Sequence, residues 1–495
     1  MTSEALTALP SPFEALGGRV SRNIVWTLAS DLVARGTSLG LAFFCARTLP
    51  VAGFGLFALT QNVAQYLWLF GDAFANSGYA AREVARAGPG MSGVAGQLYA
   101  IRAVAGLLLA LLAVAVGIAL PVGGGGRFLV LATSIYFLAY STFPDWVARG
   151  VQDFKALALA NLLTSGTMVL LVVTMFLGSP GPALACGIWA ASLVPGTVVL
   201  TVVLSVRHGL RFRPPWAGTA WRFHASRSFI FSLGAIGAMG LTLLPALLLG
   251  LLSTAEQVGL FAAGFRIVTA LVGLGAVIWW PVYPALASTA QESKEFRSLF
   301  EGFLTAMLTV SLPAALGLSI FAEEIVHTVF GSRYVGAVPI LRLMAWSVPL
   351  YFLATVFEIT ILATGGESRR VRVYATGVAV LALGSVLLIP AWGAMGAAAA
   401  HLGALAVAVT AFFGSMRGLV RAGWLRTTGS RIALGAGGLA LLWMVLRQAK
   451  VVGVWGLVSL GAIFYVVFVV RSGILPLALF VPAAYRRGAD SPGPA

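Results

Sequence analysis

Charged residues are scarce in this chain of 495 residues, and segments polar enough to form a soluble domain are absent. Only 10% of the residues are charged, whereas about a quarter are charged in typical soluble domains. Hydrophobic residues make up 59% of the chain, and the mean hydropathy is +0.94. Water therefore cannot be the main solvent around this chain, which excludes a soluble globular protein.

Cysteines, phosphate-binding loops and signal-peptide features are also lacking. Cys45 and Cys186 both lie in apolar segments, without a spacing typical of a metal site or a disulfide framework. A glycine-rich loop ending in Lys-Ser/Thr does not occur, which argues against an ATP-driven transporter. The first 18 residues carry Glu4 and Glu14 but no basic region followed by an apolar one, so we expect no cleaved signal peptide. We expect no metal ion and no organic cofactor.

Apolar runs recur instead, each about 20 residues long and thus able to cross a hydrocarbon core. They predict an all-α polytopic membrane protein with about 14 transmembrane helices, because only helices and closed barrels satisfy the backbone in lipid. The expected spans are 22–46, 53–80, 103–121, 128–147, 156–178, 183–206, 228–252, 257–289, 300–322, 336–364, 373–390, 394–416, 432–446 and 452–470.

The basic residues predict the orientation of these spans. A net charge of +16 would suggest nucleic acid as the partner of a soluble protein. Here 24 of the 32 basic residues fall on the cytoplasmic side and six on the opposite side, if the N-terminus is cytoplasmic. This bias follows the positive-inside rule. We therefore expect cytoplasmic termini, a multi-pass membrane protein and no nucleic-acid partner. Because 29 of the 32 basic residues are arginine, as in proteins of GC-rich bacterial genomes, we expect the membrane to be the bacterial cytoplasmic membrane.

Two halves of the chain resemble each other. Gly55-Leu56-Phe57-Ala58 opens the second span, and Gly259-Leu260-Phe261-Ala262 opens the eighth. Six spans in each half give both halves the same topology, so we expect a pseudo-two-fold axis along the membrane normal. The predicted parts are a cytoplasmic tail (1–21), an N-terminal six-helix lobe (22–206), a basic cytoplasmic linker (207–227), a C-terminal six-helix lobe (228–416), two additional transmembrane helices (417–472) and a cytoplasmic tail (473–495).

Six charged residues lie within the predicted spans. A charge costs about 2.5–3.5 kcal/mol near the centre of a membrane helix, so these side chains are expected to face the bundle interior or a wet cavity. The six are Asp31, Arg35, Asp72, Asp145, Arg266 and Glu358.

Several of these charges belong to polar stripes at helical spacing. The stripes are Asn23, Thr27, Asp31, Arg35 and Ser38; Gln61, Gln65, Trp68, Asp72 and Asn76; Ser141 and Asp145; Arg266, Thr269, Trp280 and Tyr283; and Tyr351, Thr355 and Glu358. Stripes in both halves predict a wet central cleft between the lobes.

Each charge has a functional and a structural interpretation. Arg266 has no acidic partner within a turn or two and suits an anionic substrate or counter-ion, because a guanidinium stays charged and donates paired hydrogen bonds to phosphate. Asp72 and Glu358 have no partner in their own helices, which favours a titrating or ion-binding role. Asp31 could instead neutralise Arg35, and Asp145, which lies close to the cytoplasmic edge near Arg149, could snorkel to that edge.

Aromatic and amide side chains complete the predicted cavity. Gln61, Gln65, Trp68, Trp280 and Tyr283 belong to these polar stripes and are the candidates for substrate contacts in the cleft. Helix packing or anchoring at the membrane interface would explain the aromatic residues equally well.

Several motifs along residues 22–416 carry a family resemblance. They are Asn23-Ile24-Val25-Trp26, Ala46-Arg47-Thr48-Leu49, Gly53-Phe54-Gly55-Leu56-Phe57, Pro144-Asp145-Trp146 with Arg149-Gly150, Glu256-Gln257-Val258-Gly259-Leu260-Phe261, Phe330-Gly331-Ser332-Arg333-Tyr334 and Ile389-Pro390-Ala391-Trp392-Gly393-Ala394-Met395-Gly396-Ala397-Ala398. Together they resemble the polysaccharide-transporter family of Wzx-type O-antigen flippases, within the multidrug/oligosaccharidyl-lipid/polysaccharide exporter superfamily.

The resemblance implies a non-enzymatic flippase for undecaprenyl-pyrophosphate-linked oligosaccharides of O-antigen, capsule or exopolysaccharide. It implies alternating access, a cationic cavity in which Arg266 and Arg35 hold the head group, and two six-helix lobes with two extra helices. This sequence departs from a strongly cationic cavity, because its embedded set has four carboxylates against two arginines. We therefore expect Asp31, Asp72, Asp145 and Glu358 to serve coupling to a proton or Na⁺, or charge pairing.

The expected partners are the lipid-linked oligosaccharide, membrane lipid, and the polysaccharide polymerase and chain-length machinery, around a monomeric flippase. Two other functions stay open. A drug/cation antiporter of the same superfamily would normally have twelve spans. A membrane-embedded polymerase or ligase would need a larger extracytoplasmic loop than this sequence has.

Overall fold

The computed structural model describes residues 12–119, 124–210, 220–279, 282–291, 293–416, 418–449 and 453–474. Every regular element within these ranges is a helix, and none of the described residues forms a strand. Nine helices in the same ranges are long and apolar enough to cross a membrane. The prediction of an all-α polytopic membrane protein is confirmed, and the total of 14 spans stays a prediction.

The chain divides into two compact units, Met1–Leu247 and Leu248–Ala495. The division falls inside one long helix, α10 (Ala220–Leu252). The predicted basic linker 207–227 thus precedes the division, and its residues 211–219 lie outside the described ranges.

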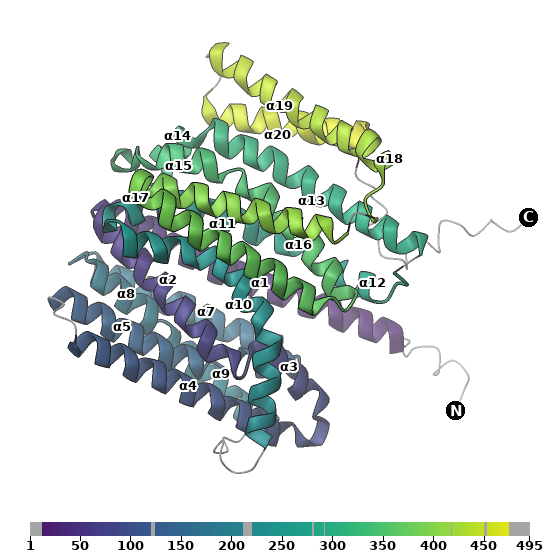
Figure 1. Cartoon of the computed structure of the whole chain (residues 1–495). Coiled ribbons are helices and arrows are strands. Elements are labelled where there is room, and N and C mark those ends of the chain that lie inside the picture. The colour runs from purple at the N-terminus through teal and green to yellow at the C-terminus, as the bar shows by residue number, and fades with distance from the viewer. Residues whose placement is uncertain are drawn as a thin grey trace, which may run out of the picture. The chain divides into compact units, whose positions relative to one another are not determined.

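Unit 1 contains nine complete helices and most of α10 in the described ranges (Figure 1). They are α1 (Pro12–Thr48), α2 (Val51–Ala73), α3 (Ser77–Arg86), α4 (Met91–Ala119), α5 (Gly124–Ser141), α6 (Asp145–Gly150), α7 (Phe154–Leu171), α8 (Pro182–Ala191) and α9 (Leu193–His208). Helix α1 packs against α7, and α5 packs between α4 and α8. The short helices α3 and α6 pack on each other around the fully buried Trp146.

Two predicted spans of unit 1 are interrupted where a polar residue or a proline restarts the helix. Helix α2 ends at Ala73, and the side chain of Asn76 caps α3 by accepting a hydrogen bond of 3.0 Å from the amide of Gly78. This cap separates 53–80 into a span and a short helix. Helix α5 ends at Ser141 and α6 begins after Pro144, because proline favours the first turn of a new helix. Asp145 therefore does not share a helix with Ser141, and the predicted stripe of these two residues is wrong.

Unit 2 holds the remaining described helices. They are α11 (Ala255–Trp279), α12 (Val282–Ala287), α13 (Lys294–Ile320), α14 (Ala322–Val329), α15 (Ala337–Met344), α16 (Ser347–Ala363), α17 (Glu367–Gly414), α18 (Ala422–Trp424), α19 (Ser430–Ala449) and α20 (Val454–Arg471).

Helix α17 reverses direction at Gly393. Its 48 residues would extend about 72 Å if straight. A Cβ atom on Gly384 would instead lie 3.2 Å from the Cβ of Ala400, so the two arms run beside each other. Gly393 makes the turn at φ 52° and ψ −126°, and the amide of Ala394 donates to the Gln257 side chain at 2.9 Å. The two predicted spans 373–390 and 394–416 correspond to these arms.

The helices α19 and α20 pack against each other near the C-terminal end of the described chain. The indole of Trp443 in α19 donates to the carbonyl of Leu457 in α20 at 2.8 Å, and its ring meets Phe321 at 5.3 Å. Both predicted extra spans, 432–446 and 452–470, thus have a helix at their positions.

Candidate functional site

An ion pair between Asp72 and Arg102 lies inside unit 1. The Arg102 guanidinium donates to the Asp72 carboxylate and to the carbonyl of Ala75 at 3.0 Å. Asn76 and Ser77 donate to the same carboxylate at 2.8 and 3.3 Å. Arg102 is 1% exposed and the Asp72 side chain 14%. A carboxylate with an ionic partner and two further donors is strongly held, because little water reaches it.

A cluster of aromatic rings packs against this ion pair. The Arg102 guanidinium lies 5.2 Å from the centre of the Trp68 ring, and Trp68 meets Tyr140 edge-on at 5.6 Å. Tyr136 stacks on Tyr140 at 5.3 Å and on Trp189 at 4.3 Å. Trp68 is 4% exposed, so its ring serves in this structure as a support for Arg102.

Glu358 of α16 has a comparable environment in unit 2. Arg370 of α17 lies 3.0 Å from one carboxylate oxygen, and the Tyr374 hydroxyl donates to the other at 2.5 Å. The Arg370 side chain is 14% exposed. Glu358 and Asp72 thus both bind an arginine and a neutral donor, and each arginine comes from the following long helix.

Arg102 and Arg370 are the functional candidates that the sequence analysis missed. Both were assigned to loops, because the predicted spans began at residues 103 and 373. The helices begin earlier, at Met91 and Glu367, so these arginines lie within helices. The sequence did contain a signal for these arginines. Asp72 and Glu358 have no basic partner in their own predicted spans, and a carboxylate in an apolar helix requires a cation from another helix.

Asp145 lies at the first position of α6 and contacts Arg149 at 3.4 Å, one turn later. The two side chains are 21% and 41% exposed, so water screens this pair. Asp145 thus lies beside Arg149, and its role in coupling or charge pairing stays a prediction.

Asp153 ties the start of α7 to the end of α9. Its carboxylate accepts a hydrogen bond from the amide of Ala156 at 3.1 Å and contacts His208 at 3.1 Å and Arg207 at 3.4 Å. Burial raises the pKa of Asp153, but the His208 and Ala156 hydrogen bonds and the Arg207 charge together bring that pKa below its ordinary value.

The other predicted site residues have less defined surroundings. Arg35 is exposed on α1, Gln65 is exposed on α2, and Gln61 is buried there. Arg266 is half-buried on α11 beside Phe265, whose ring meets the buried His401 at 5.4 Å. Tyr283 is 41% exposed on α12. Trp280 and the side chain of Asp31 lie outside what the structure describes, and so does the predicted Asp31–Arg35 pair.

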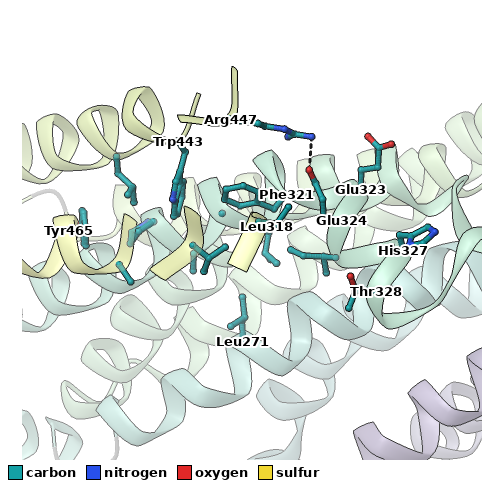
Figure 2. A pocket seen from close by; sticks show the side chains of 18 of the residues that line it. Leu271, Leu318, Phe321, Glu323, Glu324, His327, Thr328, Trp443, Arg447 and Tyr465 are labelled. Atoms are coloured by element: carbon teal, nitrogen blue, oxygen red, sulfur yellow. Dashed lines mark ion pairs between the residues drawn. The ribbon is translucent and has the colours of Figure 1, made fainter. Parts of the chain in front are cut away.

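A cavity of about 880 Å³ lies in unit 2 between α13, α14, α19 and α20. Figure 2 shows its two ends, with Tyr465 and Trp443 at one and Glu323, Glu324 and His327 at the other. Arg447 holds Glu324 at 2.7 Å and the carbonyl of Ile320 at 2.6 Å at this polar end. The cavity is therefore apolar along its length and charged at one end.

The family follows from a comparison with known proteins. A family model described as "Polysaccharide biosynthesis protein" matches residues 20–290, more than half of the chain. The chain belongs to this family. The resemblance drawn from the motifs is thereby confirmed.

Curated relatives match shorter stretches of the chain. A probable low-salt glycan biosynthesis flippase, Agl15 of Haloferax volcanii, is 22% identical over 38% of this chain and 40% of its own length. The teichuronic acid biosynthesis protein TuaB of Bacillus subtilis is 24% identical over 33% of this chain and 36% of its own length. The chain thus spans well under half of these two relatives.

Solved structures match the fold over a larger share. The lipid II flippase MurJ in an inward closed conformation superimposes with a TM-score of 0.70 at 13% identity, over 92% of this chain and 100% of that one. An inward-facing multidrug resistance MATE transporter gives 0.62 at 15% identity, over 80% and 98%. At 13% and 15% identity these likenesses show the fold alone, which is that of polytopic helical proteins.

Proposed function

We propose that this protein flips a lipid-linked oligosaccharide from the inner to the outer leaflet of the bacterial cytoplasmic membrane by alternating access. The observation that carries the proposal is family membership, joined to a fold shared with a lipid II flippase and to charges embedded in apolar helices. The substrate would be an undecaprenyl-pyrophosphate-linked repeat unit of O-antigen, capsule or exopolysaccharide. The chain would act as a transporter without catalytic activity.

Arg35 and Arg266 are the proposed ligands of the pyrophosphate. Arg35 is exposed on α1, so its guanidinium is accessible to a substrate. Arg266 is half-buried on α11, where its charge is less screened by water. Gln61, Gln65, Trp68, Trp280 and Tyr283 remain proposed substrate contacts, although the burial of Trp68 requires a conformational change before its ring can meet a sugar.

Coupling to a proton or Na⁺ at Asp72 and Glu358 is the second part of the proposal. Each carboxylate already binds an arginine, so an incoming cation would compete with Arg102 or Arg370. Protonation of the carboxylate would break the ion pair with that arginine. The helix that carries the arginine would then be free to shift to another conformation. Asp31 and Asp145 are then proposed to balance local charge.

Orientation and partners complete the proposal. The arginine-rich segments and both termini would lie in the cytoplasm. The chain would act as a monomer, deliver its product to a polysaccharide polymerase and chain-length machinery, and bind neither nucleic acid nor an organic cofactor.

The test of the proposed site is a flux assay in proteoliposomes. A labelled undecaprenyl-pyrophosphate oligosaccharide is followed as it becomes accessible from the opposite leaflet, with and without a pH or Na⁺ gradient. We expect Arg35→Ala and Arg266→Ala to slow translocation at least tenfold, because each removes one charge-assisted contact to pyrophosphate. Arg426→Ala is the matched control at an exposed position after α18, and its rate should equal that of the wild type.

Two outcomes would contradict this proposal. Translocation that is unaffected by both arginine variants would remove these residues from the site. A translocation rate that is the same with and without a pH or Na⁺ gradient would rule out ion coupling. Efflux of cationic dyes, with carboxylates as their ligands, would instead support the alternative function of a drug/cation antiporter, whose fold the MATE transporter shares.

A further inference from the structure

A second apolar groove, of about 470 Å³, lies in unit 1 between α2, α4 and α10. Almost its whole wall is hydrocarbon, which distinguishes it from the charged cavity of unit 2. We call it the α2–α4–α10 groove, and it is lined by Phe70, Gly71, Phe74, Ile101, Val104, Ala105, Leu108, Leu109, Trp221 and Ala225.

One end of this groove lies at an end of the helical bundle. Trp221 is the second residue of α10, and Ser92 at the start of α4 donates to the carbonyl of Gly209, just after α9, at 2.7 Å. The groove then follows α4 inward from Ile101 to Leu109. Eight residues of α-helix rise about 12 Å, close to the ~15 Å that one leaflet contributes to the hydrocarbon core. The groove therefore has the depth of one acyl chain of a single leaflet.

An arginine side chain lies beside the end of the groove that Trp221 lines. The Arg222 guanidinium lies 5.5 Å from the centre of the Trp221 ring, which forms part of the groove wall. Arg222 is exposed, and among the described residues no carboxylate lies within ion-pair distance of it. Contact with an aromatic face leaves the N–H groups of a guanidinium available for an anion.

The charge of Arg222 beside this end favours an anionic head group over a zwitterionic one. Arg227 and Arg82 do not add to this charge, because Arg227 lies over the Phe223 ring at 4.5 Å, outside the groove, and Arg82 contacts Glu83 at 3.6 Å. An ammonium group beside the phosphate would be repelled by this positive charge, whereas a net negative head group would be attracted by it.

We propose that the α2–α4–α10 groove binds an anionic phospholipid of the surrounding leaflet. One acyl chain occupies the groove between Ile101 and Leu109, and the phosphate takes paired hydrogen bonds from Arg222. The length of the groove matches one acyl chain, whereas only the first part of a much longer polyprenyl chain would fit between Ile101 and Leu109. This site is separate from the proposed flipping of an oligosaccharide and does not depend on it.

Native mass spectrometry of the full chain in detergent tests the site, with phosphatidylglycerol and phosphatidylethanolamine of identical chains as probes. We expect the wild type to retain one phosphatidylglycerol with roughly fivefold higher affinity than phosphatidylethanolamine, the value of about one favourable basic contact. Arg222→Ala should abolish this preference. Arg227→Ala is the matched control on the same helix, and it should keep most of the preference because its guanidinium lies over a ring outside the groove.

A second pair of variants tests the groove itself. Ala105→Phe fills the groove and should reduce binding of both lipids at least fivefold, whereas Leu112→Phe, on an exposed face of α4 outside the groove, should leave both unchanged. Melting temperatures of the four variants establish that each is folded. Equal retention of the two lipids by the wild type, or unchanged binding in Ala105→Phe, would overturn the proposal. Displacement of phosphatidylglycerol by a polyprenyl phosphate at lower concentration would overturn the assigned occupant in favour of a carrier lipid.

Discussion

Removal of the Arg102 charge is expected to destabilise unit 1 more than the loss of any exposed ion pair. In Arg102→Met, the side-chain length is kept, but Asp72 loses its cation while it remains mostly buried beside Asn76 and Ser77. Breaking one partner of a buried pair costs about 3–5 kcal/mol, because the remaining charge is left uncompensated. The ratio of folded to unfolded protein should therefore fall by more than about a hundredfold.

Equilibrium unfolding in mixed micelles, followed by tryptophan fluorescence, measures this change. Arg149→Met is the control, since its pair with Asp145 is half exposed and should contribute about 0–1 kcal/mol. The double variant Asp72→Asn with Arg102→Met should recover most of the lost stability, because no charge is then left buried. A loss in Arg102→Met of under about 1 kcal/mol, or a double variant as unstable as the single one, would refute the reasoning.

Three further predictions concern hydrogen bonds, a turn and a titrating group. Tyr374→Phe should lower the free energy of unfolding by about 1.5–3 kcal/mol through loss of its hydrogen bond to Glu358, while transport assays show whether this bond also matters for coupling. Gly393→Ala should lower the free energy of unfolding by about 1–3 kcal/mol, because the backbone at this position has a positive φ. Gly403→Ala, in a helix with open space around the position, should be neutral or stabilising. Thermal unfolding compares the two variants, and equal melting temperatures would contradict the prediction. Asp153→Asn should destabilise the protein at neutral pH and lose its effect as the pH falls below about 4, because a lowered pKa gives stability that is present above the unfolded-state value and lost through the folded-state value. Melting curves from pH 3 to pH 7 measure that difference, and a gap that stays constant over this range would refute it.

The helices were predictable because the bilayer demands long apolar runs. The arms of α17 were expected as two spans, and Gly393 stands at their turn since only glycine readily adopts its backbone conformation. The interruptions at Asn76 and Pro144 were not expected, because apolar residues continue across them and hydropathy alone does not show a cap. The side-chain cap at Asn76 and the proline at position 144 determine where these two helices end and the next ones begin.

The candidate site was predictable in its acids and less so in its bases. Asp72 and Glu358 stood out because a carboxylate inside an apolar run is costly. Arg102 and Arg370 did not, since an arginine near a span end is ordinarily counted as a loop residue under the positive-inside rule. The pairing depends on contacts between different helices, and spacing along one helix cannot reveal it.

The most direct measurement of the central claim is the rate at which the purified chain moves a lipid-linked oligosaccharide across a vesicle membrane. We predict that vesicles containing the chain translocate the undecaprenyl-pyrophosphate oligosaccharide far faster than protein-free vesicles, and that they do not accumulate a cationic dye under the same gradient. Oligosaccharide translocation at the protein-free rate, together with dye transport, would contradict the account.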